Sequence, residues 1–173
     1  MRLIIGSEST RVYASGGVDV NFLDEVYDGQ TPDILDNAYV LVDFANGCRA
    51  MLDLCMFAEG ARWQEIVTLT GTDAQVEARL PGPTRFAPPG RPDTSELAIA
   101  PRAGGQTEEV IDLPEHLKAA GDHNGSTFYQ HERFLAFARD GGAPEVSLED
   151  GLRAVQIGWA AEQSIKTGSV IAL

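Results

Sequence analysis

Short runs of alternating hydrophobic and polar residues fill the first two thirds of the chain. Alternation with a period of two is typical of a strand that buries one face. Glycine, proline and asparagine separate the runs and predict turns between them. The predicted strands are 10–20, 38–45, 48–57, 65–70, 75–80, 97–100 and 108–113. Within the first of these, Gly16 and Gly17 predict a bulge or a kink.

The strongest turn signal is Asn46-Gly47, which separates two apolar runs. A type I′ turn needs positive φ at both central residues, and these two residue types tolerate it. The sequence therefore predicts a tight hairpin here. Alternation along its first strand predicts two opposite faces, one with Val40, Val42 and Phe44 and the other with Tyr39, Leu41 and Asp43.

The last third of the chain changes to helical spacing. Ser147 is the predicted N-cap of a helix over 148–167, with Asp150 reaching back to it, and Gly168 is the predicted C-cap. A short apolar strand follows. The predicted buried face of this helix comprises Leu148, Leu152, Val155 and Trp159, widened by Ala154, Ile157, Ala161 and Ile165.

A second helix is predicted over 127–139, with Thr127 and Gln130 as a capping box. At the start of the chain, the apolar run 1–6 ends in glycine and has no start signal. It predicts the last turn of a helix that begins before Met1, so we expect an N-terminally truncated domain. The run is too short for a signal peptide.

Two segments predict loops: the polar stretch 21–37 and the stretch 81–93, which holds five of the nine prolines. Because the strands precede the helices, the fold class is α+β: an open, mostly antiparallel sheet with helices packed on one face. We expect residues 1–173 to form a single domain.

The net charge of −13 disfavours nucleic acid and anionic membranes as partners, since both are polyanions. No apolar run is long enough to cross a membrane. Cys48 and Cys55 lie seven positions apart and are not expected to pair. They predict small buried side chains in a reducing compartment, so we expect a cytoplasmic protein.

The closing segment resembles that of the Gfo/Idh/MocA oxidoreductases, the family of glucose-fructose oxidoreductase and inositol dehydrogenase. The matching residues are Pro144, Val146, Ser147, Glu149, Asp150, Gly151, Ala154, Ile157, Ala160, Ser164, Gly168 and Ile171. The hairpin 36–50 and the strand and turn 65–72 extend the resemblance to nearly the whole chain. It implies the family's C-terminal domain, which forms an open sheet with helices on one face and often uses the other face for subunit contact.

In that family, the nucleotide-binding glycine loop and the catalytic lysine of a Glu-Lys-Pro motif lie in an N-terminal Rossmann domain. Neither motif occurs in this sequence. The family's catalytic histidine belongs to a helix that would end where this chain begins. The resemblance thus implies no catalytic residue and no bound cofactor in this chain, which we expect to be inactive alone. A full-length parent would use NAD or NADP to oxidise a sugar, a polyol or a related hydroxy compound.

Candidate substrate contacts lie in two loops. Loop 57–64 offers Glu59, Arg62 and Trp63: a carboxylate, a fork of donors and a flat apolar face, which together suit a polyol or a sugar acid. A polar hairpin loop with its tryptophan packed on the core is the alternative. His123 follows Asp122, and the pair suggests acid–base chemistry, although a helix-capping loop would have the same letters.

His131 is expected to be structural, and His116 is predicted to lie in a polar loop without a partner. Three scattered histidines do not predict a metal site. Two other functions fit the same residues: a stand-alone binding or oligomerisation module, and a partner subunit without catalysis. A broad sheet face favours a homo-oligomer in every case.

Overall fold

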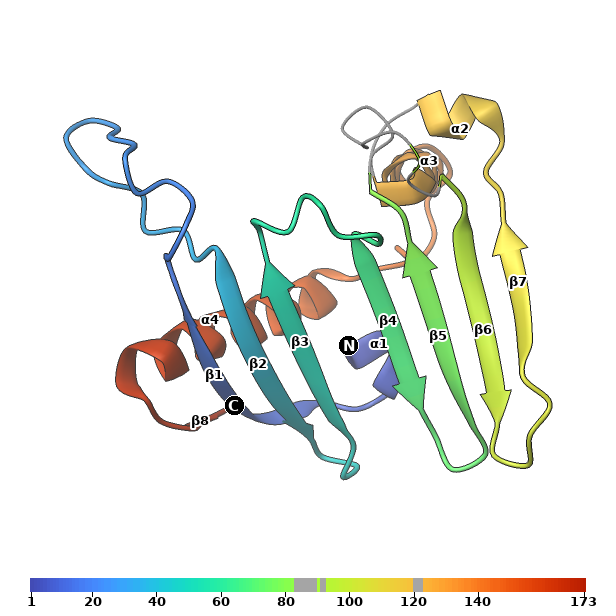
Figure 1. The fold of residues 1–173 in the computed structure, drawn as a ribbon, viewed down its shortest axis with the longest axis horizontal. Helices are drawn as coiled ribbons and strands as arrows, with labels where there is room; N and C mark the ends of the chain where they lie inside the picture. The colour runs from blue at the N-terminus through green and yellow to red at the C-terminus, as the bar shows by residue number, and fades with distance from the viewer. Residues whose placement is uncertain (83–89, 91–92, 120–122) are drawn as a thin grey trace. The chain divides into compact units, whose positions relative to one another are not determined.

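A computed structural model describes residues 1–82, 90, 93–119 and 123–173. The chain forms two compact units, one made of 1–58 and 146–173 and the other of 59–145 (Figure 1). Each unit has a four-stranded sheet, with the orders β3-β2-β1-β8 and β4-β5-β6-β7, and every strand pairing between these elements is antiparallel. The α+β class with open antiparallel sheets is confirmed. The single-domain organisation stays a prediction.

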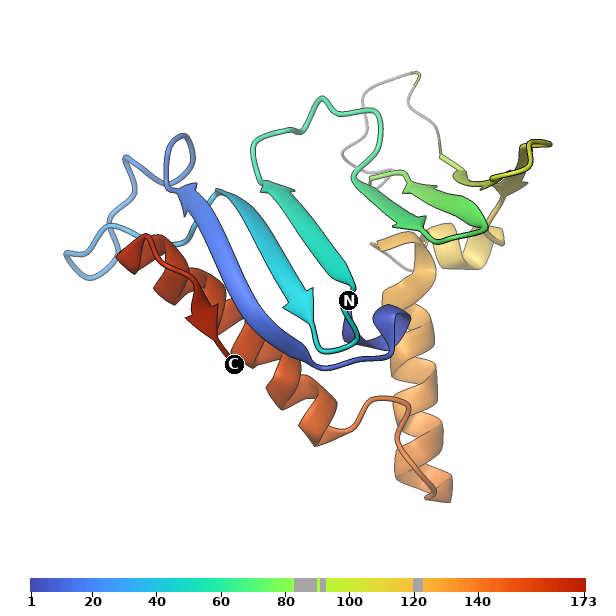
Figure 2. The ribbon, with the colours of Figure 1, turned by 90° about the horizontal axis from the view of Figure 1, so that it is seen from below.

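The first unit holds six elements, of which α4 lies along one face of the sheet (Figure 2). Their bounds are α1 Arg2–Ile5, β1 Ser9–Gly17, β2 Asn37–Phe44, β3 Arg49–Cys55, α4 Leu148–Thr167 and β8 Ile171–Ala172. The predicted faces of β2 are confirmed, since its buried residues alternate with exposed ones. The core between sheet and helix comprises Val12, Ala14, Ala38, Val40, Val42, Phe44, Ala160 and Ala161. Full burial of each larger side chain contributes about 1.5–3 kcal/mol.

The predicted buried face of α4 is wrong for its four large residues and for Ala154, which is also exposed. Leu148 is 96% exposed and Val155 is 69% exposed, and Leu152 and Trp159 are also exposed. The face toward the sheet instead carries Ile157, Ala160, Ala161, Ser164 and Ile165. Small side chains allow the helix axis to approach the strands. The larger apolar residues, at the same helical period, form a second stripe on the opposite side.

Both predicted ends of α4 are confirmed. The backbone N–H of Asp150 donates to Ser147 Oγ over 3.1 Å, and Asp150 accepts the Ser147 backbone N–H in return. Gly168 closes the helix in the left-handed region at φ 66°. Arg2 also binds Asp150, over 2.9 Å, which ties α1 to this helix. The hydrogen bond from Ser147 and then the Arg2 guanidinium hold the pKa of Asp150 at about 2.

The hairpin between β2 and β3 has a longer loop than the predicted type I′ turn. Gly47 has φ 85°, whereas Asn46 is not left-handed. The Asn46 side chain serves the loop in another way, because its Oδ1 accepts the Cys48 backbone N–H over 3.1 Å. The turn is therefore closed by a side-chain acceptor and one left-handed glycine.

The bulge predicted at Gly16 and Gly17 is wrong, because both pair in regular register and the irregularity lies between Ser9 and Arg11. Gly16 has a different role. A Cβ at this position would lie 2.8 Å from the Ala38 Cβ, so the glycine allows β1 and β2 to approach closely. The strand ends at Gly17, before the predicted limit at residue 20.

The long loop after β1 is anchored by a buried carboxylate. Asp36 is fully buried and accepts the backbone N–H groups of Asp19, Val20 and Asn21, the last two over 2.7 Å. Burial alone would raise the pKa of Asp36, but these N–H donors outweigh it and hold the pKa at about 2. The carboxylate therefore stays ionised and joins the loop to the start of β2.

The second unit consists of a sheet followed by a short helix, a turn and a 15-residue helix. Its elements are β4 Glu65–Thr70, β5 Ala74–Leu80, β6 Ser95–Pro101, β7 Thr107–Ile111, α2 Glu115–Ala119, the turn His123–Gly125 and α3 Ser126–Asp140. The predicted proline loop 81–93 falls largely outside the described residues. The sequence did not predict α2, which places His116 on a helix with its ring 6.2 Å from that of Phe128 rather than alone in a loop.

Two further predictions are corrected. The N-cap of α3 is Gly125 without a side-chain hydrogen bond, so the capping box of Thr127 and Gln130 does not form. Cys48 and Cys55 are exposed rather than buried, although they are unpaired as expected. Among the described helices, none has the length and apolar character required to cross a membrane.

Candidate functional site

The loop before β4 presents Arg62 stacked on Trp63. The Arg62 guanidinium carbon lies 5.1 Å from the centre of the indole ring, which is a cation–π contact. Arg62 is exposed and Trp63 is half-buried. The arginine therefore covers part of the aromatic ring, and another part stays exposed. Glu59 is exposed in the same loop. An apolar ring beside a fork of donors can bind a polyhydroxylated ligand through its C–H face and its oxygens.

A chain of ion pairs lies next to Arg62. Its Nη2 atom lies 3.7 Å from Glu96, which also binds Arg79 over 2.9 Å. Arg79 in turn pairs with Glu77. The carboxylates of Glu96 and then Glu77 raise the pKa of Arg79, so this guanidinium is permanently charged. Arg62 is therefore bound only loosely to a pre-formed charge network.

His123 lies against Glu65, the first residue of β4. The Nδ1 atom of His123 is 3.3 Å from Oε1 of Glu65, and about half of each side chain is exposed. A carboxylate beside one ring nitrogen orients an imidazole and leaves the other nitrogen for a ligand. The pair thus has the composition of a proton-exchanging or hydroxyl-binding site.

The backbone beneath His123 is held in an uncommon conformation. His123, Asn124 and Gly125 have φ values of 58°, 53° and 81°, all in the left-handed region. The Asn124 side chain donates to Oγ of Ser95, whose side chain is buried. Gly125 is buried as well, with Leu117 among its neighbours. These contacts stabilise a conformation that is unfavourable for non-glycine residues.

The four predicted residues form two groups. Strand register places Ile66, Arg79 and Glu96 side by side on one face of the sheet, and Arg62 reaches that face. Glu65 precedes Ile66, so its side chain points to the opposite face, where it meets His123. The structure brings Arg62 and Trp63 together but does not bring His123 to them.

Sequence reasoning missed Glu65, Ser95 and Asn124. Glu65 and His123 are 58 positions apart, and no local spacing connects them. The only available signal was that a strand begins at Glu65. Asp122, the predicted partner of His123, lies outside the described residues.

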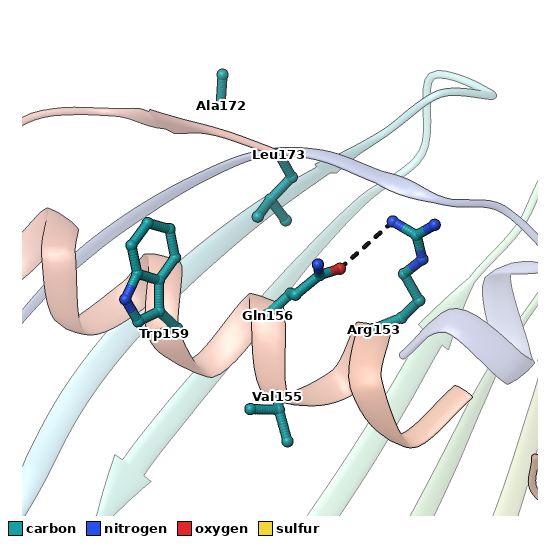
Figure 3. A pocket seen from close by; sticks show the side chains of 6 residues that line it. All are labelled: Arg153, Val155, Gln156, Trp159, Ala172 and Leu173. Atoms are coloured by element: carbon teal, nitrogen blue, oxygen red, sulfur yellow. Dashed lines mark hydrogen bonds between the residues drawn. The ribbon is translucent and has the colours of Figure 1, made fainter. Parts of the chain in front are cut away.

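A shallow hollow also lies beside α4, next to the C-terminal end of the chain (Figure 3). Its lining consists of Arg153, Val155, Gln156, Trp159, Ala172 and Leu173. Its one charged side chain is already engaged, since Arg153 donates to Gln156 over 3.3 Å and to Glu149 over 2.8 Å. The hollow offers an apolar wall and no pair of groups for proton transfer.

The described residues do not fit a dinucleotide. Such cofactors bind where a strand of a parallel sheet runs into a helix through a glycine-rich loop. Here, all pairings between the named strands are antiparallel, and glycines such as Gly47 lie in hairpin turns. Within the part of the chain that the structure describes, no group of three or more metal-ligating side chains comes together.

Several solved structures share this fold. A Kribbella flavida oxidoreductase domain protein has a TM-score of 0.67 and 16% identity, covering 99% of this chain and 47% of its own. The Caulobacter crescentus aldose-aldose oxidoreductase complexed with glycerol has a TM-score of 0.66 and 17% identity, covering 99% of this chain and 43% of its own. An Agrobacterium radiobacter oxidoreductase in complex with NAD⁺, L-tartaric acid and magnesium has a TM-score of 0.63 and 18% identity, covering 99% of this chain and 45% of its own.

These likenesses concern the fold, and the chain spans less than half the length of each relative. No curated protein matches the sequence. The sequence itself matches a family model described as the C-terminal alpha/beta domain of the oxidoreductase family, and the match extends over residues 1–173. The chain therefore belongs to the Gfo/Idh/MocA oxidoreductase family and corresponds to its C-terminal domain.

Proposed function

We propose that this chain is the substrate-binding and oligomerisation domain of an NAD(P)-dependent oxidoreductase that acts on a sugar or a polyol. The observation that carries the proposal is the family match over residues 1–173, together with a chain that spans 43–47% of three relatives. The nucleotide and the hydride-transfer chemistry would belong to another part of a longer parent. The isolated chain is inactive in this proposal, and the protein is cytoplasmic.

The substrate class is supported from two sides. One relative is complexed with glycerol and another with L-tartaric acid, and both ligands carry more than one hydroxyl group. In this chain, Arg62 and Trp63 supply a donor fork and an aromatic face within 5.1 Å of each other. The proposed substrate contacts are Glu59, Arg62 and Trp63 in loop 57–64, and His123 beside Glu65.

Oligomerisation is proposed through the outer face of the first sheet. Register aligns Tyr13, Leu41 and Met51 in a row across β1, β2 and β3, and all three side chains are exposed. Tyr39 extends the apolar surface by one row. An aligned apolar row on an open sheet is the kind of surface that a second copy covers.

Tryptophan fluorescence tests the substrate contact. The chain has two tryptophans, so the Trp159→Phe variant reports on Trp63 alone. Glycerol, D-glucose or L-tartrate at millimolar concentration is expected to change this emission in a saturable way, and Arg62→Ala should weaken the response. Arg139→Ala is the matched control, because Arg139 is an exposed arginine paired with its neighbour Asp140. An emission that no polyol changes would contradict the proposed role of loop 57–64.

A further inference from the structure

We propose that Glu65 and His123 form a hydroxyl-binding site in which Glu65 is a positioning residue and His123 accepts a hydrogen bond from a neutral polyol. The inference rests on the proposed function and names the ligand chemistry of one part of it. Nδ1 of His123 and Oε1 of Glu65 are 3.3 Å apart.

Glu65 determines which nitrogen carries the proton. An ionised carboxylate can only accept, so the neutral imidazole donates from Nδ1, and Nε2 is left bare. A bare Nε2 is an acceptor and requires a donor such as a hydroxyl group. Both side chains are about half exposed, at 54% for His123 and 48% for Glu65, so a ligand can reach the ring while the carboxylate holds it.

The loop backbone keeps the ring in place without ligand. The left-handed His123 and Asn124 are tied to the sheet by the hydrogen bond from Asn124 to Ser95, and Ser95 is only 6% exposed. A ligand therefore meets a pre-positioned acceptor, and little free energy is lost in ordering it. Two non-glycine residues with positive φ in succession are uncommon, and such conformations gather at ligand sites.

Charge selects among hydroxy compounds. The Glu65 carboxylate lies beside the same ring, 3.3 Å from Nδ1, so a carboxylate group of a ligand at Nε2 would be repelled by a nearby like charge. Neutral polyols carry no such penalty. The site therefore favours glycerol or D-glucose over L-tartrate. The cationic Arg62 lies on the other face of the sheet.

Nitrogen NMR of the ¹⁵N-histidine-labelled chain tests the assignment. Spectra are recorded at a pH at which the rings are neutral, and His123→Asn identifies the signal among three histidines. We expect the His123 proton on Nδ1 and a saturable change at Nε2 on addition of glycerol or D-glucose. A proton on Nε2, or a larger change with L-tartrate than with the neutral polyols, would overturn the inference.

Variants separate positioning from mere stability. Glu65→Ala is expected to weaken polyol affinity at His123 roughly three- to tenfold, the effect of about one hydrogen bond, and Glu65→Asp should restore part of it. Thr68→Ala, at another exposed position of β4, should leave affinity unchanged. A purely structural pair would lower the melting temperature in Glu65→Ala while polyol affinity stayed constant, and this result would also overturn the inference.

The two proposals fail in different ways. If Trp63 emission responds to polyols and the His123 nitrogens do not, the inference about Glu65 falls together with His123 as a substrate contact, and the proposed substrate class stands. If neither group responds, the proposed substrate class falls with it.

Discussion

Asp36 is the residue on which the long loop after β1 depends. Asp36→Asn keeps the shape but replaces a charged acceptor of three backbone N–H groups with a neutral one. Charged acceptors form the stronger hydrogen bonds, so we expect the melting temperature to fall by roughly 5–10 °C. Asp33→Asn is the matched control, since Asp33 is exposed in the same loop, and a change of about 1 °C is expected. Thermal unfolding followed by circular dichroism measures both.

The carboxylates of Asp36 and Asp150 also determine how the stability of the fold changes with pH in the acid range. The pKa of Asp36 and that of Asp150 are lowered from 3.8 to about 2 by folding. A lowered folded-state pKa adds stability above the unfolded value, and this contribution is lost as pH falls from about 4 to about 2. Urea midpoints should change little between pH 7 and 5 and then fall steeply below pH 4. In Asp36→Asn the fall should be shallower, and an equal slope in both proteins would count against Asp36.

For single residues, the sequence predicts contacts between partners that are close along the chain. The bond between Ser147 and Asp150 spans three positions and follows from a known capping pattern. The contact between Glu65 and His123 spans 58 positions. It depends on where the segment before α3 meets strand β4. Periodicity contains no information about such a meeting.

Helix α4 is apolar on two sides, so substitutions on each side test which of the two is buried. Leu152→Gln and Val155→Gln lie on the exposed stripe and should change the free energy of unfolding by no more than about 0.5 kcal/mol. Ala160→Leu inserts volume at a fully buried position and should cost about 1–3 kcal/mol. Urea denaturation measures all three. A loss for Leu152→Gln as large as that for Ala160→Leu would mean that the stripe is buried in solution.

Element limits were predictable where the chain has explicit end signals. The helix over 148–167 was predicted to the residue, because Ser147 and Gly168 mark its ends. Its orientation was not, since large residues at helical spacing favoured the stripe that the structure leaves exposed. The five-residue helix α2 was missed because it is too short to show a period.

For the whole molecule, the sequence predicted the fold class and the family better than the arrangement of the strands in sheets. Strands before helices gave α+β, and the motifs around Asp36 and Ser147 gave the family that the sequence match confirms. The division into two four-stranded sheets was not predicted. Short strands joined by loops predict which neighbouring strands pair. They do not predict where one sheet ends and the next begins.

Two exposed apolar surfaces in the first unit compete as the contact between copies: the row of Tyr13, Leu41 and Met51, and the outer stripe of α4. Light scattering at tens of micromolar should show a dimer for the wild-type chain. Leu41→Glu places a charge in the centre of the sheet row and should give a monomer, because an unpaired charge in an apolar contact is costly. Leu152→Gln should remain dimeric. The reverse pattern would move the contact to α4, and a monomeric wild-type chain would contradict association through either surface.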